Sequence, residues 1–508
     1  MEYELERTAL DGFEILQDTA LLREETLEMI VPDACPDILR IIETDGTVLL
    51  HQKSAQSGKA ELEGSFKLEV LYLPDGEEGV RQLPVIIPFS CTLENKAITP
   101  ETGMTASLRL YHADARLLNP RKILARGEAV VEMTLFAPVH EELSQRMSER
   151  TEEHLEQKTE ICEFYLTDSV TEQEFEIRDQ MQISSGKPAA LEILKCRAEL
   201  CRGESKLIGN KLIYKGDVRL CVVYRGTDQG IHTTGGELPY SQIMEVSGAG
   251  ESADCDLILT VTDLDSQLEP GGEERTIEIS VNILAQAVIR ENRRLEILTD
   301  AYSTSEPVIC DWRQLAFQQK RDLGHRTQNA RELWETAGEV QEILDSRLKV
   351  GQLTSSREGD KLVVTVQAEL DVLYLGSDGG LYAAQRQVSV PCNLELPEQC
   401  SCFCRCEEVG EAYSAPAAGG IESRFALDFS YCALTSAVTS VLETVQPGEE
   451  AEEAGDLPSL VLRAMEAGEQ LWDLAKAYHT TTADIISANE LSDEDAAAGR
   501  LLLIPRKR

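Results

Sequence analysis

Hydrophobic and polar residues alternate along three segments of the chain that lie 152 and 150 residues apart. The segments are 66–72, 218–224 and 368–374, and each ends in a tyrosine. Alternation with a period of two places successive side chains on opposite faces of a strand, so each segment predicts a strand with one buried face. Tyr72, Tyr224 and Tyr374 are therefore expected at equivalent strand ends of three internal repeats.

Further residues keep the same spacing in the three copies. A lysine precedes each tyrosine by 13 positions, and an isoleucine precedes it by 31. These residues are Lys59, Lys211, Lys361, Ile41, Ile193 and Ile343. Turn-forming residues follow each tyrosine, and many short strands in units of this length predict β-sandwiches or open barrels. We therefore predict a mainly β, multidomain protein with β-rich domains at 1–140, 176–305 and 336–445.

Charged residues are concentrated between these domains. Residues 141–175 and 306–335 are expected to be connectors, and the charge-dense segments 141–160 and 318–334 fit solvated helices. The segment 446–458 contains prolines, glycines and a run of acidic residues, which predicts a flexible, self-repelling linker. A separate C-terminal domain would follow at 459–508.

In this C-terminal segment the pattern changes to that of helices. Leu471, Leu474 and Tyr478 recur at helical spacing, and Thr481 with Asp484 forms a helix start signal. An apolar stretch before them and the apolar run 501–505 after them fit strands. The pattern predicts a small α+β domain in the order strand–helix–helix–strand.

This order, with Leu471-Trp472 opening the first helix and Asn489 closing the second, resembles a LysM domain. The resemblance implies a module that binds glycan or protein and has no chemistry of its own. Its groove would lie between the turn after the first strand and the loop before the last. The expected groove residues are Gly468, Glu469, Gln470, Leu471, Trp472, Asn489, Ala498, Gly499 and Arg500. Glu469-Gln470 departs from the Asp-Thr that the family usually has in this turn.

The body of the chain also resembles a known family. The first copy carries Val31-Pro32-Asp33-Ala34-Cys35-Pro36-Asp37-Ile38-Leu39 and the second opens with Met181-Gln182-Ile183-Ser184-Ser185-Gly186-Lys187-Pro188, and both are similar to SPOCS domains of endospore-forming bacteria. The third copy has Ala337-Gly338-Glu339-Val340-Gln341 instead of a proline-containing opening. SPOCS-type repeats followed by a LysM domain resemble the SipL-like spore morphogenetic proteins.

The resemblance implies a non-enzymatic scaffold of the spore coat in the mother-cell cytoplasm, at the forespore surface. Its LysM domain would bind the basement-layer coat ATPase, of the spore stage IV protein A type, and other coat proteins are further expected partners. The alternative is a cell-wall protein whose LysM domain binds peptidoglycan or another N-acetylated glycan, with hydrolase activity in the body. The two hypotheses differ in whether the protein is exported, because a wall-binding protein needs an export signal. The acidic start Met1-Glu2-Tyr3-Glu4 is unlike such a signal.

The charge and composition of the chain disfavour some classes of binding partner. The chain has 90 acidic and 48 basic residues, a net charge of −42, and such a field repels nucleic acid and anionic lipid. The longest uncharged run, 429–442, is too short to span a bilayer as a helix, so we expect no membrane insertion. The 14 cysteines lack the spacing of a small secreted disulfide fold and are expected to be mostly reduced thiols.

Four alternating cysteines are the one candidate for metal binding. Cys400, Cys402, Cys404 and Cys406 could supply four thiolates to zinc, but structural zinc sites favour Cys-x-x-Cys spacing. Strict alternation instead favours a strand with the thiols on one face, where they act as small hydrophobic groups. We therefore expect no metal and no cofactor. The sequence contains neither a His-Glu-x-x-His motif nor a phosphate-binding loop, and we expect no enzymatic activity.

Overall fold

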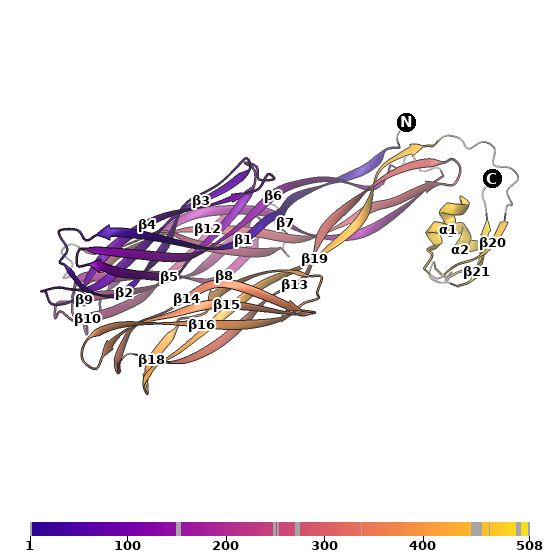
Figure 1. Ribbon diagram of the computed structural model, residues 1–508. Helices are drawn as coiled ribbons and strands as arrows, with labels where there is room; N and C mark the ends of the chain where they lie inside the picture. Colours follow the sequence, from indigo (N-terminus) through magenta and orange to yellow (C-terminus); the bar gives the residue numbers. More distant parts are fainter. Residues whose placement is uncertain are drawn as a thin grey trace.

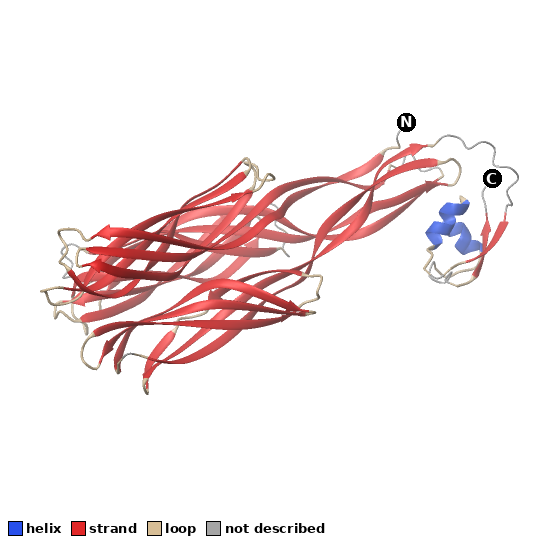
Figure 2. Cartoon of the chain, in the orientation of Figure 1, coloured by secondary structure: helices blue, strands red, loops and turns tan. Residues whose placement is uncertain are grey.

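The structure is a computed structural model that describes residues 3–148, 154–246, 250, 253–269, 275–336, 338–448, 460–466, 468–493 and 499–505. Strands make up nearly all of the body, and two short helices lie in the C-terminal module (Figure 2). This confirms the predicted mainly β, multidomain fold. No helix in the described part of the chain is long and apolar enough to cross a membrane.

The first repeat is a sandwich of two three-stranded antiparallel layers. One layer has the order β2-β3-β4, and the other has the order β1-β6-β5. Apolar side chains from both layers form one core, with Phe66, Leu68 and Met133 completely buried. The strands are β1 (Leu5–Ile30), β2 (Ile38–Gln56), β3 (Lys59–Pro74), β4 (Arg81–Glu94), β5 (Gly103–Asn119) and β6 (Lys122–Met147).

The second and third repeats follow the same strand order. The second consists of β7 (Leu155–Gln182), β8 (Ala190–Ile208), β9 (Lys211–Gly226), β10 (Ile231–Glu245), β11 (Asp254–Leu268) and β12 (Thr276–Ser303). The third consists of β13 (Val308–Glu335), β14 (Val340–Glu358), β15 (Lys361–Gly376), β16 (Leu381–Glu395), β17 (Ser401–Glu408), β18 (Tyr413–Ala417) and β19 (Gly420–Pro447). In the third repeat the short strands β17 and β18 both pair with β19. They replace the single strand that the first repeat has as β5 and the second repeat has as β11.

Strand register confirms that the tyrosines and isoleucines are equivalent. Tyr72 lies opposite Ile41, Tyr224 opposite Ile193, and Tyr374 opposite Ile343. A β-bulge follows the isoleucine in every copy, so that the next paired residues are Glu43, Lys195 and Asp345. The bulge turns these charged side chains away from the sandwich core and toward the other two repeats.

The first and last strands of each repeat continue beyond the sandwich as a paired ribbon. Leu5 of β1 lies opposite Met147 of β6, and the pairs β7–β12 and β13–β19 extend in the same way. The three ribbons lie together as a stalk that projects from the body (Figure 1). Two apolar clusters join the ribbons; they include Leu143, Phe164 and Val441 in one and Met147, Leu298 and Leu442 in the other.

The stalk corrects the interpretation of the charge-dense segments as helical connectors. Residues 141–147 lie in β6, residues 155–160 lie in β7, and 318–334 lies in β13. In 141–147 exposed charged side chains alternate with the buried Leu143 and Met147, and nearly all residues of β1, β6, β13 and β19 pair with a neighbouring strand. Strand pairing and burial of one face therefore outweigh the helical propensity of the charged residues. Of the predicted flexible linker, residues 446 and 447 lie in β19, whereas 449–458 lies outside the described residues.

The C-terminal module has the predicted order of elements. It consists of β20 (Leu460–Ala464), α1 (Leu471–Tyr478), α2 (Thr482–Ala488) and β21 (Leu501–Pro505). β20 and β21 pair antiparallel, and the module lies beside the end of the stalk (Figure 1).

Candidate functional site

The C-terminal module holds the residues that the sequence indicates for binding. Leu471, Leu474 and Ala475 of α1 pack with Ile485 of α2 and Ile504 of β21 in a small core. The Thr481 hydroxyl accepts a hydrogen bond from the backbone N–H of Asp484 at 2.9 Å, which confirms the expected cap of α2.

Asn489 fastens the second helix to the last strand. Its side-chain amide donates to the carbonyl oxygens of Ile485 and Leu503 at 2.8 and 2.7 Å, and its side-chain oxygen accepts from the N–H of Leu503 at 2.7 Å. These three bonds use the polar groups of Asn489 within the module. Asn489 therefore joins α2 to β21, and its side-chain amide is used within the module.

The turn before α1 forms one rim of the predicted groove. Gly468 has a φ of 93°, a left-handed conformation that suits glycine, and it is exposed. The Glu469 carboxylate accepts from the N–H of Glu466 at 2.9 Å and pairs with Arg463. The acid that the sequence places in this turn is thus held by an arginine of β20, and its charge is already balanced.

The opposite rim is only partly described. Gly499 has a φ of 71°, and Arg500 is exposed and accepts a hydrogen bond from Met465 through its carbonyl oxygen at 3.0 Å. This bond links the residue after β20 to the residue before β21. Ala498 lies outside the described residues.

The first helix of the module packs against the end of the stalk. The indole N–H of Trp472 donates to Asp300 of β12 at 2.7 Å, and the Trp472 ring meets the Tyr302 ring edge to face, with centroids 4.8 Å apart. The Tyr302 hydroxyl donates to the carbonyl oxygen of Thr480 at 2.7 Å. Tyr302 is 3 % exposed and Trp472 is 8 % exposed, so the two rings share one buried cluster with the core of the module.

Charged side chains complete this contact. Lys476 of α1 donates to both oxygens of Asp300 at 2.6 and 2.8 Å, and its ammonium lies 5.5 Å from the centre of the Trp312 ring. Lys158 of β7 donates to the side-chain oxygen of Gln470 at 2.6 Å. Gln470 and Trp472, two of the expected groove residues, are therefore in contact with the protein's own stalk.

The stalk residues of this contact could not be found from the sequence. Asp300 and Tyr302 precede Trp472 by about 170 positions. They lie in β12, and the charge pattern of the sequence does not indicate that this strand is part of a stalk. An aspartate and a tyrosine two positions apart in a strand are common, and no motif marks them. The contact becomes visible only when the module is placed on the stalk.

The alternating cysteines lie on a strand, as expected. Cys402, Cys404 and Cys406 belong to β17, and Cys400 precedes it. Cys400 and Cys406 are buried in the core of the third repeat, and Cys402 and Cys404 pack against it. Burial raises the pKa of the Cys404 thiol to about 12, which keeps it protonated. Among the described residues, no group of three or more histidine, cysteine or acidic side chains is arranged to hold a metal ion.

Comparison with protein families agrees with this architecture. The SipL, SPOCS domain model matches residues 37–118 and 189–269, and the LysM domain model matches residues 466–505. The chain therefore has a SipL-like architecture. The matched SPOCS regions cover β2 to β5, except the last residue of β5, and all of β8 to β11, which are the corresponding parts of the first two repeats. No curated protein and no solved structure matches the chain.

The third repeat extends the SPOCS architecture beyond the two matches. It has the same succession of long strand, three-stranded layer and returning long strand, with Tyr374 in register with Ile343. The domains relate the chain to sporulation, and they are of binding or scaffold types rather than catalytic ones. The LysM domain belongs to a class of modules that bind peptidoglycan and related glycans.

Proposed function

We propose that this SipL-like chain is a non-enzymatic scaffold of spore-coat assembly, and that its LysM domain binds a protein, the coat basement-layer ATPase. In this proposal the chain works in the mother-cell cytoplasm at the forespore surface. The observation that carries it is the engagement of the LysM domain with protein: Trp472 and Gln470 contact the stalk through Asp300, Tyr302 and Lys158.

The electrostatics of the groove support a protein partner. Glu469 is paired with Arg463, whereas Arg500 on the opposite rim is exposed, and the groove is therefore not uniformly neutral. An exposed guanidinium suits an acidic protein surface at least as well as an uncharged N-acetylated sugar. The stalk also gives the LysM domain a fixed position relative to the three SPOCS repeats, which is what a scaffold requires.

Capture of the two candidate ligands in parallel tests the proposal. Full-length chain, a truncation after residue 458, and Arg500→Glu would each be offered to the purified coat ATPase and to purified peptidoglycan. Arg178→Glu serves as the control, because this arginine is also exposed and lies on the body. We expect the truncation to lose the ATPase, and Arg500→Glu to bind it more weakly than the control, more visibly at low salt.

The alternative function predicts the opposite pattern. Tight binding of the wild type to peptidoglycan, with ATPase capture unaffected by the truncation, would support a wall-binding protein. The match of residues 466–505 to the LysM family is the observation that keeps this alternative open.

A further inference from the structure

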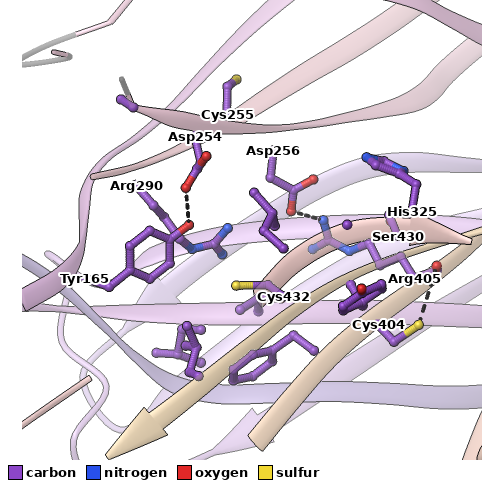
Figure 3. A pocket seen from close by; sticks show the side chains of 18 of the residues that line it. Tyr165, Asp254, Cys255, Asp256, Arg290, His325, Cys404, Arg405, Ser430 and Cys432 are labelled. Carbon is purple, nitrogen blue, oxygen red and sulfur yellow. Dashed lines mark hydrogen bonds and ion pairs between the residues drawn. The ribbon is translucent and has the colours of Figure 1, made fainter. Parts of the chain in front are cut away.

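A cavity of about 390 Å³ lies in the body where all three repeats meet (Figure 3). Asp18 of the first repeat, Arg202 and Arg290 of the second, and Arg405 of the third contribute to its wall. These residues come from strands of all three repeats, so the cavity exists only when the repeats are assembled. Its size suits a small organic molecule.

Three arginines from different strands converge on this cavity. Arg405 forms an ion pair with Asp256 (Figure 3), and Arg202 donates to the carbonyl oxygen of Leu257 at 2.8 Å and pairs with Glu407. Burial alone would raise the pKa of Asp256, but Arg405, then Arg290 and Arg202, hold it below its usual range. A single carboxylate thus lies within the field of three guanidinium groups.

The other acids of the wall are already engaged. Asp254 pairs with Lys320 at 2.6 Å and accepts the Tyr165 hydroxyl at 2.9 Å, and Asp18 accepts the Thr134 hydroxyl at 2.6 Å. Among the described residues, the guanidinium of Arg290 forms neither a hydrogen bond nor an ion pair, although its charge acts on Asp256. The cavity therefore contains one guanidinium whose N–H donors are not used by any described residue.

Arg290 lies in the wall of the cavity rather than on the fully exposed surface. The chain has 90 acidic and 48 basic residues, so acidic side chains outnumber basic ones. Arg290 is partly buried, and its guanidinium has five N–H donors that favour the planar, bidentate acceptors of carboxylates and phosphates. Apolar groups complete the wall, among them Phe403, Leu323 and Leu207, and can cover a hydrocarbon part of a ligand.

We propose that this cavity binds a small organic anion, a carboxylate or a phosphate monoester, through Arg290. Arg202 and Arg405 provide additional positive potential. Because the wall comes from all three repeats, a bound anion joins the repeats and stabilises their assembly. This cavity is separate from the LysM groove, and the proposal does not depend on the partner proposed for the LysM domain.

Thermal unfolding with defined probes tests the site. Sodium benzoate and sodium phosphate would each be added to the full-length protein, with sodium chloride holding the ionic strength constant. At saturating probe we expect the Tm of the wild type to rise by about 1–2 °C with at least one of them, because ligand that binds only the folded state stabilises it. Arg290→Gln should lose this rise, and Arg290→Lys should keep part of it.

The matched control is Arg294→Gln on the same strand. Arg294 pairs with Glu163 at the surface and lies outside the cavity wall, so this variant should respond to the probes like the wild type. An equal rise in the wild type and Arg290→Gln would reveal a general salt effect and overturn the proposal. Absence of any rise in the wild type would overturn it as well.

Thiol protection provides a readout that does not depend on stability. Cys255 and Cys432 contribute to the cavity wall and are partly exposed, whereas Cys35, which is also partly exposed, lies between β1 and β2 and is not part of the wall. Bound probe should slow alkylation of Cys432 or Cys255 by at least about 3-fold in the wild type, followed by peptide mass spectrometry. The rate at Cys35 should not change. Equal rates with and without probe at all three thiols would contradict occupation of the cavity.

Discussion

Lys195 forms a buried ion pair of 2.8 Å with Asp345, the residue that occupies the same position in the next repeat. The counterpart of both in the first repeat is Glu43, which lies 3.1 Å from the Lys195 ammonium. All three side chains are almost completely buried. Residues at one position of the repeat therefore meet one another where the three sandwiches come together.

The repeats differ in charge at this meeting point, and the differences are complementary. Two positions further along the chain, Asp45, Arg197 and Arg347 continue the pattern, with Arg347 pairing with Asp45 at 2.6 Å and Arg197 pairing with Asp345 at 3.0 Å. Identical repeats would place three like charges together, which costs free energy in a buried site. Divergence of the three copies thus allows one chain to fold as three unequal parts around a common centre.

Removing the lysine should destabilise the body strongly. Lys195→Met leaves Glu43, Asp45 and Asp345 without their shared cation in a buried site, and loss of one partner of a buried pair costs about 3–5 kcal/mol. Urea unfolding measures the change. Lys215→Met is the control, because its pair with Glu204 is exposed and should contribute less than about 1 kcal/mol. Equal unfolding midpoints for the two variants would show that the buried network contributes little.

A second prediction concerns pH. Burial raises the pKa of Glu69 to about 8 and that of Glu43 to about 7. The folded state therefore keeps protons that the unfolded chain releases above its ordinary carboxyl pKa, here 4.5. Stability should fall as the pH rises through the window between these values. We expect a lower urea midpoint at pH 8 than at pH 5.5.

Glu69→Gln separates this effect from other titrations. A glutamine side chain cannot ionise, yet its oxygen can still accept the N–H of Cys196, which Glu69 accepts at 3.3 Å. The variant should therefore lose less stability than the wild type between pH 5.5 and pH 8. Glu63→Gln, at an exposed position of the same strand, should follow the wild type. A variant midpoint that falls as steeply as that of the wild type would rule out Glu69 as the source.

The local pattern of each repeat could be predicted from the sequence, because period-two alternation reports directly which strand face is buried. Tyr72, Tyr224 and Tyr374 consequently lie where the pattern places them. The long strands could not be predicted, since their stalk portions carry many charges and bury only narrow apolar seams, as at Leu143. The Asp300–Trp472 contact was also hidden, because it depends on how two separately folded parts meet.

The docking of the LysM domain should depend on Asp300. Asp300→Ala removes the acceptor of the Trp472 indole and of the Lys476 ammonium. Amide hydrogen exchange in peptides of 471–480 should become faster, because the helix loses its contact with the stalk. Asp473→Ala changes an exposed acid on the same helix and should leave the exchange rate near that of the wild type. Unchanged exchange in Asp300→Ala would contradict docking through this carboxylate.

Trp472 should matter both to the fold of the LysM domain and to its docking, and two substitutions separate these roles. Trp472→Ala removes a ring that is 8 % exposed and packs in the core of the module, so it should destabilise the module by about 3–5 kcal/mol. Trp472→Phe keeps an aromatic ring but loses the N–H that binds Asp300, so the module should stay folded while its contact with Tyr302 and the stalk weakens. Hydrogen exchange across 460–505 measures both effects: Trp472→Ala should raise exchange throughout the module, and Trp472→Phe mainly in the peptides of α1 and in those around Tyr302. If Trp472→Ala raised exchange only around Tyr302, the ring would serve docking alone, and its assignment to the core of the module would be wrong.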